Sequence, residues 1–234
     1  MPNQVLNFDT NPPISVAEYD KLIEMALPGY SAMQTMVLAC LKSRLPETAS
    51  VLVIGAGTGT ELVTLGCRNP HWQLTGVDPS NSMLAQARQK VAQYNLRDRV
   101  ILVQGYTENL TTTSLYDAAT SILVMHFLPD DGSKLRFLQS ISERLKLSAS
   151  LVLVDVHGEK DTLELNEMID ILAVCREEMG MPLEKHLQTM AAFHQGVYPV
   201  SESRTLNLLQ QAGFSKILRF YTGLWVGGWI ATKV

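Results

Sequence analysis

The chain has 234 residues and a net charge of −4, with 46% hydrophobic and 18% charged residues. A chain of this length buries roughly 70% of the surface that it exposes when unfolded, so it needs no disulfide or metal in order to fold. The composition excludes a disordered or fibrous protein, and the near-neutral charge argues against a DNA-binding protein with a basic stripe.

The three cysteines predict neither a disulfide framework nor a zinc site. Cys40, Cys67 and Cys175 lie far apart, and none belongs to a CxxC pair. The first residues, MPNQVLNFDTNPP, lack the basic and apolar regions of a signal peptide. No stretch has the roughly 18 apolar residues of a membrane-spanning helix. We therefore expect a protein of the reducing cytoplasm, with no membrane partner.

Two helices open the chain. Apolar residues at helical spacing predict a helix over 15–27, which Pro28-Gly29 ends. A second helix is predicted from there to about Pro46. The continuous apolar run 51–54 is typical of a parallel strand that is covered on both faces.

Strands and helices then alternate as far as His157. This alternation predicts right-handed crossovers and a doubly wound sheet. Within it we expect strands over 73–77, 99–103, 117–125 and 150–156, and helices over 60–68, 80–94 (with Ser80 as N-cap) and 131–146.

After His157 the alternation stops. We predict helices over 161–179, 183–195 and 201–212, and closing strands over 215–222 and 226–233. The chain would thus form a single domain, 1–234, with a helical cap (1–49), a core (50–157 and 201–234) and a helical lid insertion (158–200).

A glycine-rich turn joins the first strand to the next helix. Its sequence is Gly55-Ala56-Gly57-Thr58-Gly59-Thr60-Glu61, and such a turn lets backbone N–H groups at a helix start approach a ligand closely. Asp78, nineteen residues beyond Gly59, ends the second strand. A carboxylate there can accept both hydroxyl groups of an adenosine ribose.

The glycine spacing favours S-adenosylmethionine (SAM) over a dinucleotide. The dinucleotide pattern GxGxxG requires a glycine where this chain has Thr60. Glu61 at the helix start suits the cationic amino-acid end of SAM better than a pyrophosphate. A nucleotide cofactor, and a turn that serves only helix–sheet packing, are the alternatives.

Residues 51–128 resemble the class I SAM-dependent methyltransferases, with the motifs in the family's order. The glycine turn resembles the first motif, and Gly76-Val77-Asp78-Pro79-Ser80 with Met83-Leu84 resembles the second. Gln104-Gly105-Tyr106-Thr107 is similar to the segment that contacts adenine. Ser121-Ile122 and His126-Phe127-Leu128 are similar to the motif beside the sulfonium.

This resemblance implies an α/β fold that is Rossmann-like and doubly wound, with a seven-stranded sheet of order 3-2-1-4-5-7-6 and one antiparallel strand. It also implies an enzyme that binds S-adenosyl-L-methionine and releases S-adenosyl-L-homocysteine. The implied cofactor-binding residues are Tyr30, Gly55, Ala56, Gly57, Gly59, Asp78, Pro79, Met83, Tyr106, Thr107, Ser121 and Ile122.

Three further motifs are similar to a subgroup that contains the carboxy-SAM synthases and small-molecule methyltransferases with a helical insertion after strand five. They are Leu27-Pro28-Gly29-Tyr30-Ser31, His157-Gly158-Glu159 and Gln211-Ala212-Gly213-Phe214. In that subgroup the tyrosine at the position of Tyr30 reaches the cofactor carboxylate. Carboxy-SAM synthases hold the extra carboxylate with an arginine of the insertion, and 183–200 contains no arginine, so ordinary SAM is expected.

Two histidines are the catalytic candidates. Methyl transfer requires alignment and exclusion of water, and it requires a base only where the nucleophile is protonated. His126 and His157 follow the fourth and fifth strands, at the edge where ligands bind in such sheets. Each can act as a general base near neutral pH, and each can instead be a packing residue. Asp155 with His157 makes too small a set for a metal, so we expect none.

The sequence therefore predicts a SAM-dependent methyltransferase with a small-molecule acceptor that enters between cap and insertion. A carboxy-SAM synthase-like enzyme of tRNA modification and a SAM-binding module without transferase activity are the alternatives. A macromolecular acceptor is also possible, and so is a homodimer. Trp225 and Trp229 either pack against the sheet or contribute to a subunit contact. Residues 158–200 contain three basic and eight acidic residues, a net −5, and such a lid disfavours a polyanion and tolerates neutral or cationic small molecules.

Overall fold

The computed structural model describes residues 8–9, 15–111 and 114–234, and most of the N-terminal segment in which no signal peptide was predicted lies outside them. Seven strands form one sheet in the order β3-β2-β1-β4-β5-β7-β6, as predicted. The strands are Ser50–Ile54 (β1), Gln73–Asp78 (β2), Val100–Gln104 (β3), Tyr116–Ile122 (β4), Leu145–Val156 (β5), Phe214–Gly223 (β6) and Val226–Lys233 (β7).

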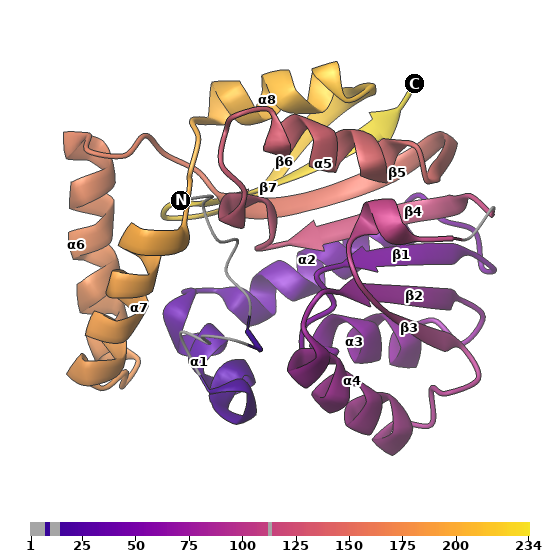
Figure 1. Ribbon diagram of the computed structural model, residues 1–234, viewed down its shortest axis with the longest axis horizontal. Coiled ribbons are helices and arrows are strands. Elements are labelled where there is room, and N and C mark those ends of the chain that lie inside the picture. The colour runs from indigo at the N-terminus through magenta and orange to yellow at the C-terminus, as the bar shows by residue number, and fades with distance from the viewer. Residues whose placement is uncertain (1–7, 10–14, 112–113) are drawn as a thin grey trace.

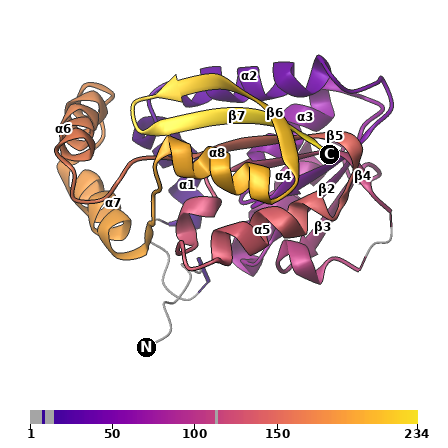
Figure 2. The ribbon, with the colours of Figure 1, turned by 90° about the horizontal axis from the view of Figure 1, so that it is seen from above.

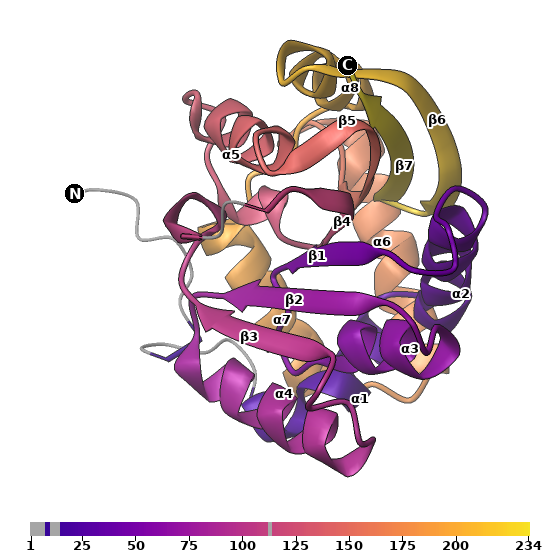
Figure 3. The same ribbon diagram turned by 90° about the vertical axis from the view of Figure 1, so that its right-hand side faces the viewer.

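The strand directions also agree with the prediction. Strands β1 to β5 pair in parallel, and β7 runs antiparallel to both of its neighbours, β5 and β6. Figure 3 shows β3, β2, β1 and β4 side by side in that order. The sheet therefore changes direction of growth between β1 and β4, which creates the crevice where ligands bind in open α/β sheets.

Eight α-helices accompany the sheet in the described part of the chain. They are Tyr19–Ala26 (α1), Tyr30–Lys42 (α2), Thr60–Arg68 (α3), Asn81–Gln93 (α4), Ser133–Ser142 (α5), Leu163–Glu178 (α6), Leu183–Gly196 (α7) and Glu202–Gln211 (α8). Ser80 caps α4 as predicted, since its Oγ accepts the N–H of Met83 at 3.2 Å. Within the described residues, none of these helices is both long and apolar enough to cross a membrane.

Apolar side chains fill both faces of the sheet. Val51 and Val53 of β1 pack into one cluster with α2, α3 and α4, whereas Leu52 and Ile54 pack into a second cluster with α5 and α8. This alternation follows from the two-residue repeat of a strand. Figure 2 shows α2 and α3 on one side of the strands and α5 and α8 on the other.

The insertion stands beyond one end of the sheet. Figure 1 shows α6 and α7 together there, next to α1. The chain leaves β5 at His157 and returns beside it, because His157 and Val200 form a parallel bridge and the Gly158 N–H donates to the Val200 carbonyl at 3.0 Å. Thus 43 residues, 158–200, are added at a single point of the core.

Several predicted boundaries are wrong, among them the start of β5, which lies at Leu145 instead of 150. Strand β4 ends at Ile122 instead of 125, because Leu123 has a φ of +58° and a 3-10 helix follows at Met125–Phe127. Helix α5 ends at Ser142, because Leu145 already pairs with Tyr116 in the long strand β5. The predicted helix over 15–27 begins as a 3-10 turn, Val16–Glu18, and becomes α-helical at Tyr19.

The glycine at the start of α3 gives a first prediction. Gly59 has a φ of +84°, and a Cβ added there would lie 2.9 Å from the Ala87 Cα. Gly180 has a similar φ of +81°, with nothing within 4 Å of an added Cβ. Gly59→Ala should therefore lose the roughly 1–2 kcal/mol of the left-handed backbone plus about 1–3 kcal/mol of overpacking. Gly180→Ala should lose only the former.

Urea denaturation of the two variants measures the difference directly. Equal losses of unfolding free energy in the two proteins would contradict the steric contact between α3 and α4.

Candidate active site

The glycine turn lies against the end of β4. Gly55 has a φ of +71°, and a Cβ on it would meet Val124 Cγ2 at 2.3 Å. Only glycine therefore lets the turn after β1 approach the segment after β4 this closely. The two segments form the floor of a crevice at the reversal of strand order.

Asp78 joins this turn to the end of β2. Its Oδ2 accepts the Gly57 N–H at 2.8 Å and its Oδ1 accepts the Ser80 N–H at 2.9 Å. Burial raises the pKa of the Asp78 carboxyl above its usual value. Each carboxylate oxygen keeps acceptor capacity beyond these bonds, so the carboxylate can also receive the hydroxyl groups of a ribose.

A first cavity opens along this crevice. Most of the predicted cofactor-binding residues line it: Gly55, Gly57, Asp78, Pro79, Met83, Tyr106, Thr107 and Ile122. Its volume of about 130 Å³ is about ten times what one water molecule needs. Asp78, predicted to bind the ribose, and Tyr106-Thr107, predicted to contact the adenine, thus line the same cavity although they were predicted from separate motifs.

A smaller cavity continues on the other side of the turn. Tyr30 and Ala56 line it together with Glu61 and Gln34, and the Gln34 Nε2 donates to the Tyr30 hydroxyl at 3.1 Å. Glu61 is buried, and its Oε1 has no hydrogen-bond partner among the described residues. Burial raises the pKa of this carboxyl to about 7. A buried carboxyl oxygen without a hydrogen-bond partner fits the ammonium group of the amino-acid end of SAM.

Helix α1 is tied to the same turn by a polar cluster. Asp20 Oδ1 accepts the hydroxyl groups of Thr58 at 2.5 Å and Thr60 at 2.9 Å. Lys90 of α4 forms an ion pair with Asp20 and donates to both threonines, at 3.0 and 2.8 Å. Asp20 therefore attaches α1 both to the glycine turn and to α4.

Two predicted cofactor residues lie outside these cavities. Gly59 packs against α4, as described above. Ser121 is fully buried within β4, and its Oγ has no hydrogen-bond partner among the described residues. Ten of the twelve predicted cofactor-binding residues therefore line the first cavity or the smaller cavity.

A second large cavity, of about 140 Å³, lies between α1, the insertion and the start of β7. Apart from His126, Arg176, Thr189 and Tyr19, its walls are apolar: Phe8, Ile23, Ala26, Leu27, Leu123, Phe127, Val156, Met190, Phe193, Val197, Trp225 and Val226. Phe8, Tyr19, Leu123 and Phe127 line the first cavity as well. The two cavities are therefore neighbours with a common wall.

His126 is the predicted catalytic residue that reaches this cavity. Its Nδ1 lies 2.5 Å from Asp155 Oδ1, and its backbone N–H donates to Asp155 Oδ2 at 3.1 Å. Asp155, on β5, is 1% exposed. This carboxylate fixes His126 with the proton on Nδ1 and leaves Nε2 as the acceptor.

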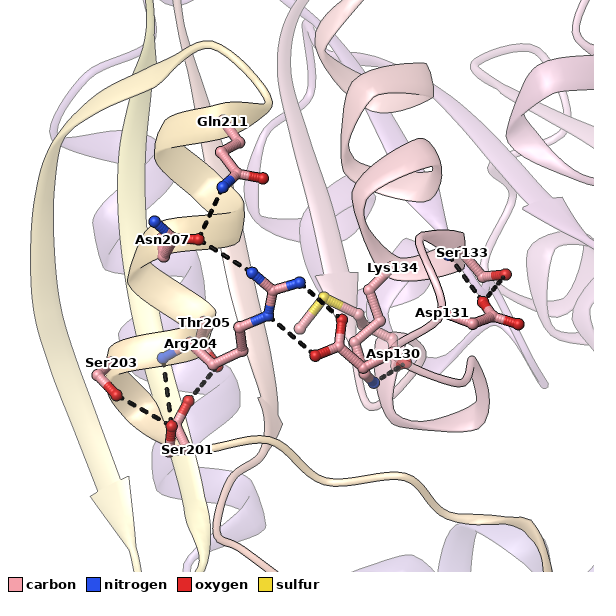
Figure 4. A network of polar contacts seen from close by, with 11 residues as sticks. Asp130, Asp131, Ser133, Lys134, Ser201, Ser203, Arg204, Thr205, Asn207 and Gln211 are labelled. Carbon is pink, nitrogen blue, oxygen red and sulfur yellow. Dashed lines mark hydrogen bonds and ion pairs between the residues drawn. The ribbon is translucent and has the colours of Figure 1, made fainter.

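The turn that carries His126 is fixed from several sides. The buried Lys134 donates to the Met125 carbonyl at 2.9 Å, and the Tyr198 N–H donates to the His126 carbonyl at 2.7 Å. Figure 4 shows Arg204 of α8 reaching Asp130, just beyond the turn, with two bonds of 2.9 and 3.0 Å. The histidine is therefore preorganised rather than placed on a free loop.

The structure does not bring His157 to either large cavity. The Nε2 of His157 lies 3.2 Å from the Arg219 Nη2, and its ring makes an edge contact with Trp229. Arg219 in turn pairs with Glu202 at 2.6 Å. Burial and the nearby Arg219 charge lower the pKa of His157. This arrangement stabilises the corner between β5 and the insertion.

Several residues of the site were missed from the sequence. Asp155 was considered only with His157, Arg176 lies in a helix that the pattern showed as simply amphipathic, and Trp225 was left between two packing roles. Phe8 belongs to a segment without periodicity. No local sequence pattern could predict that these residues lie at the site, because their positions depend on contacts between distant parts of the chain.

Comparison with known proteins gives the class. The methyltransferase domain family matches residues 52–151. The carboxy-S-adenosyl-L-methionine synthase of Campylobacter jejuni is 26% identical over 92% of this chain and 89% of its own length. The magnesium protoporphyrin IX methyltransferase of Synechocystis, solved with S-adenosylhomocysteine, superposes with a TM-score of 0.64 at 16% identity over 88% of this chain and 84% of that one.

A candidate O-methyltransferase from Nostoc punctiforme superposes with a TM-score of 0.67 at 14% identity, over 95% of this chain and 61% of that longer chain. The matched domain, the fold and the relatives together support a class I SAM-dependent methyltransferase family for this chain. The matched methyltransferase domain and the relatives support an enzyme that uses SAM, and the sequence is similar to the carboxy-SAM synthases over 92% of its length.

The raised pKa of Glu61 predicts a pH dependence of stability. The folded-state pKa of about 7 exceeds the ordinary value of 4.5, so the folded protein binds more protons between these two values. The contribution of Glu61 to the free energy of unfolding should therefore be fully present below about pH 4.5 and be lost as the pH rises through about 7. The fall should amount to about 3 kcal/mol, at about 1.4 kcal/mol per pKa unit.

Thermal or urea unfolding without ligand, at a series of pH values, measures this contribution as the difference between wild type and Glu61→Gln. The neutral glutamine has the same shape and should lack the fall. Stability curves of the two proteins that run parallel across this window would refute the assignment.

Proposed function

We propose that this enzyme transfers the methyl group of SAM to a hydroxyl group of a small-molecule acceptor in the second cavity. The observation that carries the proposal is the buried His126–Asp155 pair on the wall of an apolar cavity that adjoins the cofactor crevice. A methyltransferase needs such a base only where the nucleophile must lose a proton, as a hydroxyl oxygen does.

Residues on both sides of the glycine turn would hold the cofactor. Asp78 would accept the ribose hydroxyl groups, Glu61 would pair with the ammonium group, and Met83, Tyr106 and Thr107 would enclose the adenine. When bound, SAM supplies an electrophilic methyl carbon on a positively charged sulfur. The residues around the turn are the ones that the structure gathers into adjoining cavities.

His126 would act as the general base. Its Nε2 would take the hydroxyl proton as the acceptor oxygen forms a bond to the methyl carbon, while the carbon–sulfur bond breaks and its electron pair stays on sulfur. Asp155 would stabilise the imidazolium that results, as a carboxylate does behind a catalytic histidine.

The apolar walls would exclude water. Phe127, Phe193 and Trp225 line the second cavity, and a dry site favours loss of charge from the sulfonium, because the charged ground state is less well solvated there. The three cysteines are free thiols, which suits the reducing cytoplasm that we keep as the proposed location. A homodimer stays a prediction.

The similarity to the carboxy-SAM synthases supports a second candidate, an enzyme that carboxylates SAM. The similarity extends over 92% of this chain. Mass spectrometry of the copurified ligand separates the candidates: SAM or S-adenosylhomocysteine favours methyl transfer, and carboxy-SAM favours the second candidate.

Cofactor binding tests the first part of the proposal. Asp78→Ala should weaken SAM affinity by at least about tenfold, because charge-assisted hydrogen bonds to the ribose are lost. Isothermal titration calorimetry measures the affinity, with His126→Gln as the control that should bind SAM like wild type. Unchanged binding in a folded Asp78→Ala protein would remove the assigned ribose contact.

The two histidines provide a matched pair for the chemistry. With the most active acceptor from a panel of hydroxyl compounds, His126→Gln should lower kcat by about 10²- to 10⁴-fold through loss of the base. Asp155→Asn should also lower kcat, because it no longer fixes the tautomer. His157→Gln should leave kcat nearly unchanged.

Release of S-adenosylhomocysteine gives the rate in each case. A larger effect of His157→Gln than of His126→Gln would reverse the assignment.

A further inference from the structure

A buried arginine lines the second cavity. Arg176, near the end of α6, is 2% exposed and stands among the cavity's otherwise mostly apolar walls. Its Nε and Nη2 donate to the Ala26 carbonyl at 3.2 and 3.1 Å, and its Nη1 contacts the Met190 sulfur at 3.5 Å. A guanidinium has five N–H groups, so two stay available after these three contacts.

No carboxylate of the described residues pairs with this charge. Its three contacts are with a carbonyl and a thioether, and burial alone lowers its pKa to about 10, so it stays charged at neutral pH. All eight acidic residues of the insertion are exposed to solvent: Glu159, Asp161, Glu164, Glu167, Asp170, Glu177, Glu178 and Glu184. A buried charge without an opposite charge is costly, and an anionic ligand would remove that cost.

We propose that Arg176 binds a carboxylate group of the methyl acceptor, so that the substrate is a small hydroxy acid. This inference rests on the proposed function and specifies its substrate class. The acid group would lie at Arg176, the hydroxyl group at His126, and an apolar or aromatic body against Phe193 and Trp225, all of which line one cavity.

The shape of the guanidinium supports a carboxylate rather than another anion. Its planar fork matches the two oxygens of a carboxylate. Phosphate also fits such a fork, but it carries more charge than one arginine balances. In the described part of the chain, no lysine and no second arginine lines this cavity.

Arg176 also ties α6 to the end of α1, since the Ala26 carbonyl belongs to the last turn of that helix. A test must therefore separate carboxylate binding from lid attachment. Lys185 of α7 offers the matched control, because it reaches Glu18 beside α1 at 3.3 Å and does not line the cavity.

The experiment compares acids with their methyl esters. The probes are 4-hydroxycinnamate and 3-hydroxybenzoate, each against its ester, titrated calorimetrically into the protein with and without S-adenosylhomocysteine. Wild type should bind at least one acid about 10- to 100-fold more tightly than its ester, which is the effect of charge-assisted hydrogen bonds. Arg176→Met should lose this preference and Lys185→Met should keep it.

The outcomes separate the two proposals. Equal affinity for acid and ester in wild type, or an unchanged preference in folded Arg176→Met, would overturn the inference. Carboxy-SAM that copurifies with wild type and not with Arg176→Met would also overturn it, because the carboxylate would then belong to the cofactor. Preferred binding of an acid without any methyl transfer would refute the proposed function and leave the carboxylate site standing.

Discussion

The close approach of the glycine turn to the end of β4 determines where everything else in the site lies. Val124 occupies the space that a side chain at Gly55 would need, so β1 and β4 end against each other. Asp78 then fixes the turn to β2, and Asp20 fixes it to the cap helix. The backbone of the turn, the Asp78 carboxylate and the cap helix are thereby held together, and the first cavity and the smaller cavity both open against the turn.

The fold and much of the cofactor crevice followed from the sequence because their determinants are local. A strand, a glycine turn and the carboxylate that ends the next strand follow one another within 28 residues, Val51 to Asp78, and their spacing specifies their geometry. The end of α5 could not be found in this way, since the pairing of Tyr116 with Leu145 decides it, and the end of β4 depends on the positive φ of Leu123.

Pairs of distant residues set the limits of prediction in the second cavity. His126 and Asp155 are 29 residues apart, and nothing in either segment alone shows that they meet. His157 looked equivalent to His126 by its place after a strand, but Arg219 and Trp229, far along the chain, surround it. The net −5 of the insertion does not describe the lining of the second cavity, because its acidic residues are exposed to solvent whereas Arg176 lines the cavity.

The wall shared by the two cavities has an energetic consequence. Phe8, Tyr19, Leu123 and Phe127 face both spaces, so a ligand that moves or orders one of these side chains from one side changes the surface offered to the other. Any such change in affinity is reciprocal, because the coupling free energy between two binding sites is the same in either direction. If the methyl donor and the acceptor bind in these two cavities, as we propose, each therefore changes the affinity of the protein for the other.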